Sequence, residues 1–251
     1  MSAKRATGKR VKTVRRDGAK TAKRKVTRVR VRESAADRKA RAKKIVRGLK
    51  RLYPDADCAL HHDSALKLLV STILSAQSTD VTVNKITPKL FARFPTAADL
   101  AQADLGELER IIHASGFFRQ KSKSIKNACR MIVENHDGRV PDRLDALVEL
   151  PGVARKTANV VLGTWFNRND GVVVDTHVGR LATRMGLTWR SKNDKDAVKI
   201  EQDLMESIPQ RQWTFFGHAM IRHGRRVCSA RKPDCPGCKL STYCPSAGSF
   251  E

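Results

Sequence analysis

Apolar residues recur at helical spacing through most of the chain from residue 36 onward, separated by short polar breaks. Two stripes are especially regular: Leu66, Leu69, Val70, Ile73 and Leu74 in one, and Ile125, Ala128, Cys129, Ile132 and Val133 in the other. Residues spaced three and four apart line one face of a helix. The same pattern predicts further helices at Arg38–Leu52, Thr79–Phe94, Leu105–Ala114, Arg143–Glu149, Thr176–Met185, Asp194–Ile208 and Trp213–His223.

Strand patterns are nearly absent from the chain. The only short candidate is "GVVVD" at Gly171–Asp175, and no clear internal repeat or low-complexity insertion follows the first 35 residues. A chain that is helical almost throughout, with no alternating pattern to build a sheet, belongs to the all-α fold class. We therefore expect an all-α protein.

One further helix begins in an unusual way, within "ELPGVARKTANVVLGTWF". Pro151 and Gly152 break the preceding segment, and from about Ala154 the apolar residues return at helical spacing, which places Arg155 and Lys156 in the first turn. The positive end of the helix dipole disfavours cations there. Two explanations are an anion held by the free N–H groups of the helix start, or an amine whose pKa is lowered by positive surroundings. A solvated lysine is the ordinary alternative.

The net charge of the chain indicates which kind of partner it binds. The 251 residues hold 50 Lys and Arg against 25 Asp and Glu, a formal net charge of +25, which favours a polyanion, nucleic acid before membrane. Residues 1–35 concentrate this charge without an aromatic residue, so we expect a disordered basic arm that meets phosphates, with a targeting role as the alternative. No secretory signal is expected, and no segment approaches the roughly 18–20 apolar residues of a membrane span.

Four of the six cysteines gather near the end of the chain. Cys228, Cys235, Cys238 and Cys244 are spaced C-x6-C-x2-C-x5-C, whereas Cys129 lies on a core stripe and Cys58 has no assignment. Clustered thiols in a chain without a secretory signal favour a metal centre over disulfides. The spacing leaves zinc and an iron–sulfur cluster both open.

The chain resembles endonuclease III, the helix-hairpin-helix DNA glycosylase and abasic-site lyase, from about residue 36 to its end. The resemblance is carried by "LLVSTILSAQSTDVTVNK", "ELPGVARKTANVVL", "VVVDTHVGRLATRMGL" and "CSARKPDCPGCKLSTYC", in that order. It implies that the four cysteines hold a [4Fe–4S] cluster. It also implies two lobes, with residues 36–63 packing against a cluster lobe of residues 172–251, and residues 64–171 forming a helical barrel that carries the hairpin.

The same resemblance assigns the chemistry to two residues. Lys156 is implied as the nucleophile that attacks the sugar C1′, expels the base and forms a Schiff base before β-elimination, helped by Arg155, which we expect to lower the lysine pKa. Asp175 is implied as the second catalytic residue, and it also fits an N-cap. The hairpin of Leu150, Gly152 and Ala154 is expected to bind a DNA phosphate, although the family usually has glycine where Ala154 stands. Arg155, which follows the hairpin, is also expected to contact DNA.

Contacts to DNA are implied at five further positions. Gln77 and Phe117 are expected to enter the duplex where a base has been extracted, although Phe117 also fits a core residue that anchors its loop. His177 is a candidate DNA contact, with a capping or solvated histidine as the alternative. Arg231 and Lys232 are candidate contacts to DNA phosphates. We expect a monomer that acts on double-stranded DNA with damaged pyrimidines or abasic sites, cytoplasmic in a bacterium, nuclear or organellar in a eukaryote.

Two other functions fit parts of the sequence. A monofunctional mismatch glycosylase of the same fold normally has another residue in place of Lys156. A helix-hairpin-helix protein that binds DNA without catalysis requires neither Lys156 nor Asp175. Trapping with borohydride on abasic DNA separates these alternatives from a bifunctional enzyme.

Overall fold

Short polar side chains begin most of the helices in the computed structural model, which describes residues 32–249. The side-chain oxygen of the N-cap residue accepts a backbone N–H of the first turn at Ser34, Ser64, Thr79, Thr96, Asp104, Asp175 and Asp196. Such caps satisfy donors that a helix start otherwise leaves unpaired. No side chain caps the helix that begins at Arg155.

The described residues form eleven α-helices. Their bounds are α1 (Ala35–Leu52), α2 (Ala65–Ser75), α3 (Asp80–Arg93), α4 (Ala97–Gln102), α5 (Leu105–Ile112), α6 (Phe118–Asn135), α7 (Leu144–Glu149), α8 (Arg155–Thr164), α9 (Thr176–Arg184), α10 (Ala197–Ser207) and α11 (Trp213–Arg226). Short 3-10 helices lie at His113–Ser115 (η1), Gln210–Gln212 (η2) and Ser241–Tyr243 (η3). Residues 32–249 contain no strand, so the all-α prediction is confirmed.

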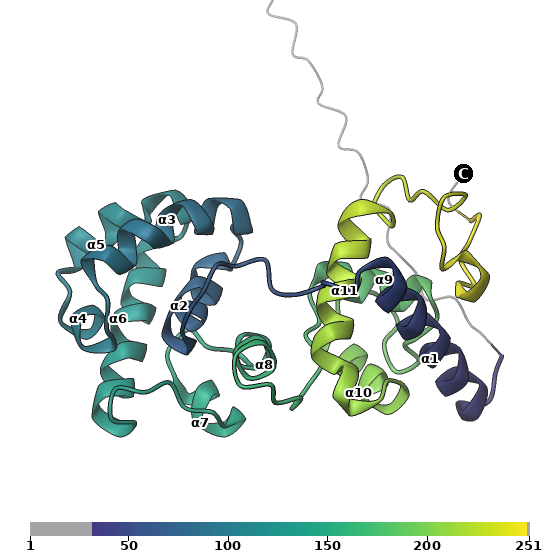
Figure 1. The fold of residues 1–251 in the computed structure, drawn as a ribbon, viewed down its shortest axis with the longest axis horizontal. Helices are drawn as coiled ribbons and strands as arrows, with labels where there is room; N and C mark the ends of the chain where they lie inside the picture. The colour runs from purple at the N-terminus through teal and green to yellow at the C-terminus, as the bar shows by residue number, and fades with distance from the viewer. Residues whose placement is uncertain (1–31, 250–251) are drawn as a thin grey trace, which may run out of the picture.

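The first lobe surrounds α2. Every residue of α2 from Leu68 to Leu74 is buried, because α3, α6 and α8 pack around it, and Figure 1 shows α2 inside the ring of helices. A helix that is apolar on all sides is stable only in such a central position. Of the second predicted stripe, Ile125, Ala128, Cys129 and Ile132 are buried, but Val133 is exposed.

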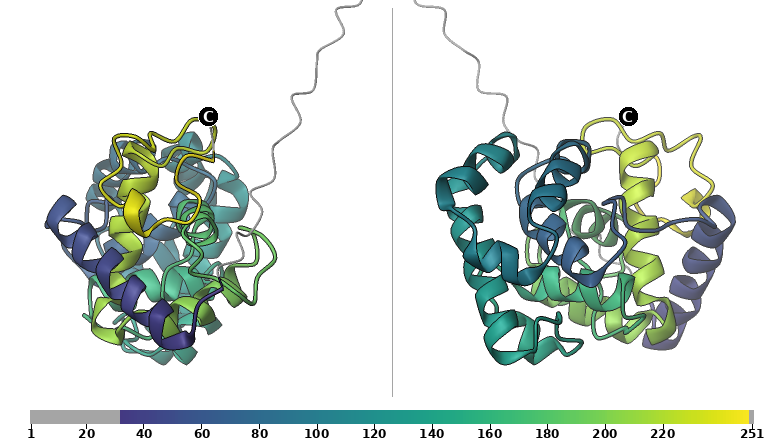
Figure 2. Two further views of the ribbon diagram at one scale, coloured as in Figure 1. Left: turned by 90° about the vertical axis from the view of Figure 1, so that its right-hand side faces the viewer. Right: turned by 60° about the vertical axis from the view of Figure 1, so that its left-hand side comes forward.

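The second lobe joins the two ends of the described chain. Helix α1 packs against α10, α11 and η3, and its residues Ile45 and Leu49 share a core with Phe216 and Leu240. Figure 2 shows α1 beside the C-terminal loops in both views.

The segment between the lobes, residues 171–175, has no regular secondary structure and pairs with no strand among the described residues. Val173 belongs to the core of the first lobe, whereas Val172 and Val174 belong to that of the second. Alternate side chains therefore point into different cores, which gives the sequence a strand-like pattern. The strand expected at Gly171–Asp175 is wrong for this reason.

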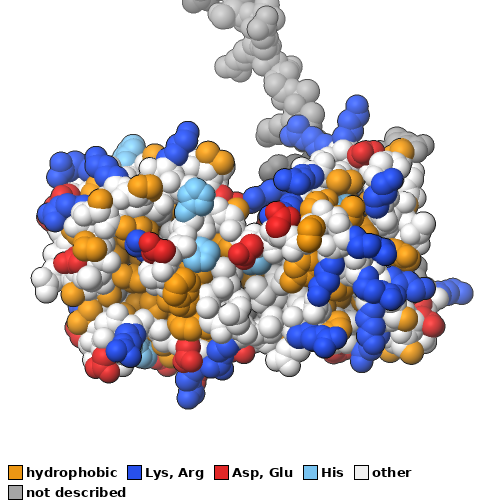
Figure 3. Space-filling model, in the orientation of Figure 1, with side chains coloured by type: hydrophobic (Ala, Val, Ile, Leu, Met, Phe, Trp, Pro, Cys, Tyr) orange, Lys and Arg blue, Asp and Glu red, His pale blue; other side chains and the backbone are white. Residues whose placement is uncertain are grey.

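Cations dominate one part of the surface. Figure 3 shows Lys and Arg side chains gathered over the second lobe, where α1 exposes Lys39, Lys43, Lys44, Arg47, Lys50 and Arg51. Most of the predicted basic arm, residues 1–31, lies outside the described residues. No helix within residues 32–249 has the length and apolar character required to span a membrane.

Candidate functional site

A tight turn precedes α8. The N–H of Val153 donates to the carbonyl of Leu150 at 3.0 Å, and Gly152 has φ +81°, a combination typical of a type II turn with Pro151 in its second position. The side chain of Leu150 is buried in the core of the first lobe. Leu150 is only 2% exposed, so this predicted DNA-binding residue supports the turn from inside the lobe and offers no surface to an outside ligand.

The start of α8 leaves backbone donors available. Within residues 32–249, the N–H groups of Gly152 and Ala154 donate to no protein acceptor, and both residues are exposed. Ala154 has φ −86° and ψ 166°, an extended conformation without strain for alanine. Alanine in place of the family's glycine therefore does not strain the backbone at this position. Lys156 is exposed in the first turn.

Arg155 pairs with an acid from the other lobe. Its Nε lies 3.0 Å from Oε2 of Glu201 on α10, and the Nδ2 of Asn159 donates to Oε1 of the same carboxylate at 2.9 Å. A Cβ at Gly171 would overlap both Glu201 and Asn159, so glycine there permits their contact. The ion pair with Glu201 explains the placement of Arg155, one of the two cations at the helix start. Nothing near Glu201 in the sequence predicts this contact.

Asp175 caps α9 with one oxygen of its carboxylate. Oδ1 accepts the N–H groups of His177 and Val178, each at 2.8 Å, and Oδ2 accepts no hydrogen bond from the described residues. One oxygen is thus structural and the other remains available for chemistry. No hydrogen bond or ion pair joins Asp175 to Lys156 within residues 32–249.

His177 is half-buried beside Arg180. The Nη2 of Arg180 lies 3.1 Å from Nδ1 of His177, and burial lowers the pKa of the imidazole, although the charge of Asp175 opposes this shift. Because a guanidinium only donates, Nδ1 is the acceptor and a neutral ring carries its proton on Nε2. The remaining ring nitrogen of His177 is therefore a donor.

Gln77 and Phe117 share an unusual backbone conformation. Gln77 has φ +54° and Phe117 has φ +48°, values that residues other than glycine seldom adopt, and both are exposed. Phe117 is 66% exposed, which excludes the alternative that it anchors its loop in the core. Strained exposed residues of this kind concentrate at functional sites.

The four clustered cysteines line a single pocket. Cys228, Cys235, Cys238 and Cys244 surround it together with His223 and Met185. Burial, with a smaller contribution from negative charge on the other three cysteines, raises the pKa of the Cys244 thiol to about 11. All four are free of disulfides. Within residues 32–249, no three His, Cys, Asp or Glu side chains converge closely enough to hold a single metal ion.

Arg184 organises the loop that follows Cys228. This buried residue donates to the carbonyls of Ser229 and Ala230 at 2.7 and 2.8 Å and to the Sγ of Cys228 at 3.2 Å. Arg231 and Lys232, the predicted phosphate contacts, are exposed in the same loop. The role of Arg184 was not predicted, because a cation on a helix ordinarily faces solvent.

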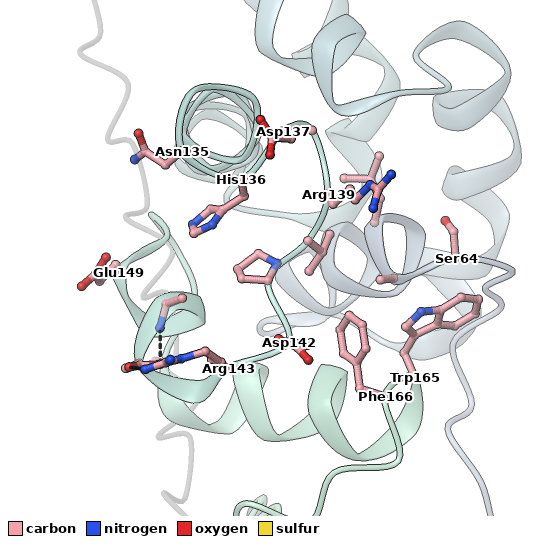
Figure 4. A pocket seen from close by; sticks show the side chains of 17 residues that line it. Ser64, Asn135, His136, Asp137, Arg139, Asp142, Arg143, Glu149, Trp165 and Phe166 are labelled. Atoms are coloured by element: carbon pink, nitrogen blue, oxygen red, sulfur yellow. Dashed lines mark hydrogen bonds and ion pairs between the residues drawn. The ribbon is translucent and has the colours of Figure 1, made fainter.

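A groove of about 900 Å³ lies on the first lobe, away from all these residues. Figure 4 shows the side chains of Trp165, Phe166 and Arg143 among those that line it. Trp165, the residue that follows α8, is partly exposed at the helix end. None of the predicted site residues lines this groove.

Comparison with known proteins gives a consistent result. The sequence profile of the HhH-GPD superfamily base excision DNA repair protein matches residues 70–210. Endonuclease III of Synechocystis sp. is 54% identical over 212 residues, which cover 84% of this chain and 95% of the relative. Endonuclease III of Bacillus subtilis is 40% identical over 195 residues, 77% of this chain and 86% of the relative.

Two solved structures of endonuclease III with DNA are also similar, each with a TM-score of 0.78 and covering 84% of this chain and 97% of the other. One is a trapped covalent intermediate in an estranged-adenine complex, 37% identical, and the other is a non-covalent complex, 38% identical. A thermostable thymine-DNA glycosylase, 22% identical with a TM-score of 0.75, shares the fold.

Proposed function

This chain belongs to the endonuclease III family of HhH-GPD base-excision DNA repair enzymes, and we propose that it removes oxidised pyrimidines from duplex DNA and cuts the abasic site through Lys156. It is a DNA glycosylase with abasic-site lyase activity. The observation that carries the assignment of Lys156 is its exposed amine in the first turn of α8, directly after the turn of Pro151 and Gly152.

The chemistry requires Lys156 as a neutral amine. Its Nζ attacks C1′ of the damaged nucleotide, the bond from C1′ to the base breaks, and the base leaves with the bonding electrons. Opening of the sugar gives a protonated Schiff base between Nζ and C1′. Loss of a proton from C2′ then expels the 3′ phosphate, which cuts the strand, and water releases the lysine.

Asp175 supports this chemistry with the oxygen that does not cap α9. Its Oδ2 is available to accept a proton from Lys156 or to stabilise positive charge that develops on the sugar. The cap fixes the position of the carboxylate, since Oδ1 is held by two backbone donors. One residue thus has a structural and a catalytic role.

The turn before α8 supplies a site for a DNA phosphate. The N–H groups of Gly152 and Ala154, together with the positive end of α8, suit an anion. We assign further backbone contacts to His177, Arg231 and Lys232, and we assign to Gln77 and Phe117 the filling of the space that a flipped nucleotide leaves. A phosphate held beside Lys156 brings the neighbouring sugar within its reach.

A [4Fe–4S] cluster fits the cysteine pocket better than zinc. Zinc holds its sulfurs about 2.3 Å from one ion, whereas the four thiols of this pocket surround a wider space. When bound, the cluster supplies positive charge that binds the four thiolates and so cross-links the loop after α11. Cys228, Cys235, Cys238 and Cys244 are the proposed ligands.

The proposal also covers the domain organisation of the chain and its location in the cell. We assign residues 64–171 to a barrel unit, with residues 36–63 and 172–251 as a cluster unit and residues 1–35 as a basic arm, in a monomer. The bacterial relatives favour a site of action at the chromosome in the cytoplasm.

Borohydride trapping on a duplex with an abasic site tests the reaction class. The wild type should cross-link to DNA, and Lys156→Gln should abolish both cross-linking and excision while duplex affinity changes by no more than a few fold. Lys199→Gln, an exposed lysine of α10, is the matched control and should behave as wild type. Normal cross-linking by Lys156→Gln would contradict the assignment and favour another nucleophile.

A further inference from the structure

Lys121 is a buried cation in the first lobe that the reaction above does not use. It is only 5% exposed, and its Nζ donates to the backbone carbonyls of Leu74 and Ser115, each at 2.7 Å. Burial lowers the pKa of this ammonium below its usual value. Lysine is among the residues least often buried, so its position requires a reason.

The position of Lys121 in its own helix does not supply that reason. Lys121 lies in the first turn of α6, where the helix dipole opposes a cation. Its Nζ instead meets the carbonyl of Leu74 in the last turn of α2, where the dipole favours a cation. The contact is therefore favourable for α2 and for η1, not for α6.

The two carbonyls that Lys121 binds belong to the segments that carry Gln77 and Phe117, two of the four exposed residues other than glycine with positive φ within residues 32–249. Leu74 precedes Gln77 by three positions, and Ser115 precedes Phe117 by two. These segments are 40 residues apart in sequence, from Gln77 to Phe117, yet one ammonium joins their backbones. Gln77 and Phe117 consequently lie on loops with a common anchor.

We propose that Lys121 is a positioning residue for base extrusion: it holds the loops of Gln77 and Phe117 at a fixed separation, so that both side chains enter the duplex together. The inference rests on the proposed function, because it assumes that these two side chains fill the space of a flipped nucleotide. Lys121 itself contacts no DNA. It acts by keeping the two loops pre-organised, which removes an ordering cost from binding.

A contact between two aromatic rings also stabilises the loop of Phe117. The ring of Phe118, the next residue after Phe117, packs against the ring of His113 with centroids 4.5 Å apart. Phe118 thus faces inward while Phe117 is exposed. The positive φ of Phe117 produces this divergence between neighbouring rings, and the bond from Lys121 to Ser115 fixes the preceding residues.

The test compares Lys121→Met with Lys126→Met. Methionine keeps an unbranched chain but removes the donors, so the carbonyls of Leu74 and Ser115 lose their partner. Lys126 is the matched control, because it also lies on α6 and its Nζ also donates to a backbone carbonyl, that of Ala103, at 2.6 Å. Lys121→Arg, which keeps the charge and the donors, is the second variant.

Two substrates separate positioning from folding. The first carries an oxidised pyrimidine in a base pair, and the second a preformed abasic site, from which no base must be extracted. Active sites are titrated by borohydride trapping on the second substrate, and 2-aminopurine opposite the lesion reports entry of protein side chains into the duplex. Each variant is compared in single turnovers at saturating DNA.

We expect Lys121→Met to slow excision of the paired base about tenfold and to reduce the 2-aminopurine signal, while trapping at the abasic site changes less than about threefold. Lys121→Arg should recover part of the loss, and Lys126→Met should match wild type. Equal losses on both substrates, or no loss on either, would overturn the proposal. Failure of wild type to trap abasic DNA would instead contradict the proposed function itself.

Discussion

Arg155 at the start of α8 and Glu201 on α10 form an ion pair that joins the two lobes, with 3.0 Å between Arg155 Nε and Glu201 Oε2. The Glu201 side chain is 9% exposed and that of Arg155 is 46% exposed, so the acid is desolvated while the cation still meets water. The pair anchors the helix turn that carries Lys156 to the second lobe. It therefore contributes to the position of Lys156, the proposed nucleophile, as well as to stability.

Glu201→Gln should lower the melting temperature by roughly 4–8 °C. A hydrogen bond to a charged group contributes about 2 kcal/mol, and a chain of this size changes its melting temperature by about 2–4 °C per kcal/mol. Arg143→Gln is the control, because Arg143 and Asp145 are 68% and 63% exposed and such pairs contribute little. Thermal unfolding followed by circular dichroism gives the melting temperature of each variant. Equal decreases for the two variants would show that the inter-lobe pair contributes no more to stability than an exposed pair.

Asp175→Asn should slow base excision by roughly a hundredfold without loss of folded protein. Asparagine caps a helix about as well as aspartate, but it has no carboxylate to accept a proton. Single-turnover excision and circular dichroism should be measured on the same preparation. Asp196→Asn, which changes the cap of α10, controls for the capping effect alone. A destabilised Asp175→Asn with a normal rate per folded molecule would leave Asp175 only its structural role.

Purified protein should contain about four iron atoms per chain and be coloured. Cys238→Ser should remove most of the iron and destabilise the second lobe, because the pocket loses one of its four thiols. Cys129→Ser, a cysteine buried in the first lobe, is the control and should keep its iron. Metal analysis and visible absorption report the outcome, and colourless protein with stoichiometric zinc would rule out the cluster.

Gly152→Ala should weaken duplex binding and lower stability. Its φ of +81° disfavours a side chain by about 1–2 kcal/mol, and the added Cβ would lie 2.7 Å from Cβ of Ser124. Gly138→Ala isolates the first effect, because Gly138 has φ +72° but no neighbouring atom within 4 Å of an added Cβ. Only Gly152→Ala should reduce affinity in a titration with duplex DNA, whereas equal affinities for the two variants would exclude a role of this turn in binding.

Helical periodicity predicted most of the fold because it is a local property of the chain. The helix behind Pro151 and Gly152, for example, starts at Arg155 as its pattern indicated. Helix α4, with only six residues, has too few turns to display a period and was missed. Residues 171–175 imitate a strand, since two cores rather than two faces of a sheet bury alternate side chains.

The long-range polar contacts could not be predicted from the sequence. Nothing local to Glu201 or Lys121 distinguishes them from the many charged residues that face solvent. Their importance arises from partners on other elements, Arg155 in one case and the carbonyls of Leu74 and Ser115 in the other. The grouping of the four cysteines around one pocket was predictable because the thiols stand close together in sequence, whereas Arg184, which donates to the loop after Cys228, is remote from them in sequence.

The packing of α1 against α11 and η3 also sets the order in which the protein can form during synthesis. Helix α1 emerges first from the ribosome, but residues 53–212 must be translated before α11 begins. The core of the first lobe, drawn from residues 60–173, is continuous in sequence and can form earlier. The nascent α1, rich in Lys and Arg, can bury its apolar face only after α10, α11 and the cysteine loop have been synthesised, so the second lobe completes after the first.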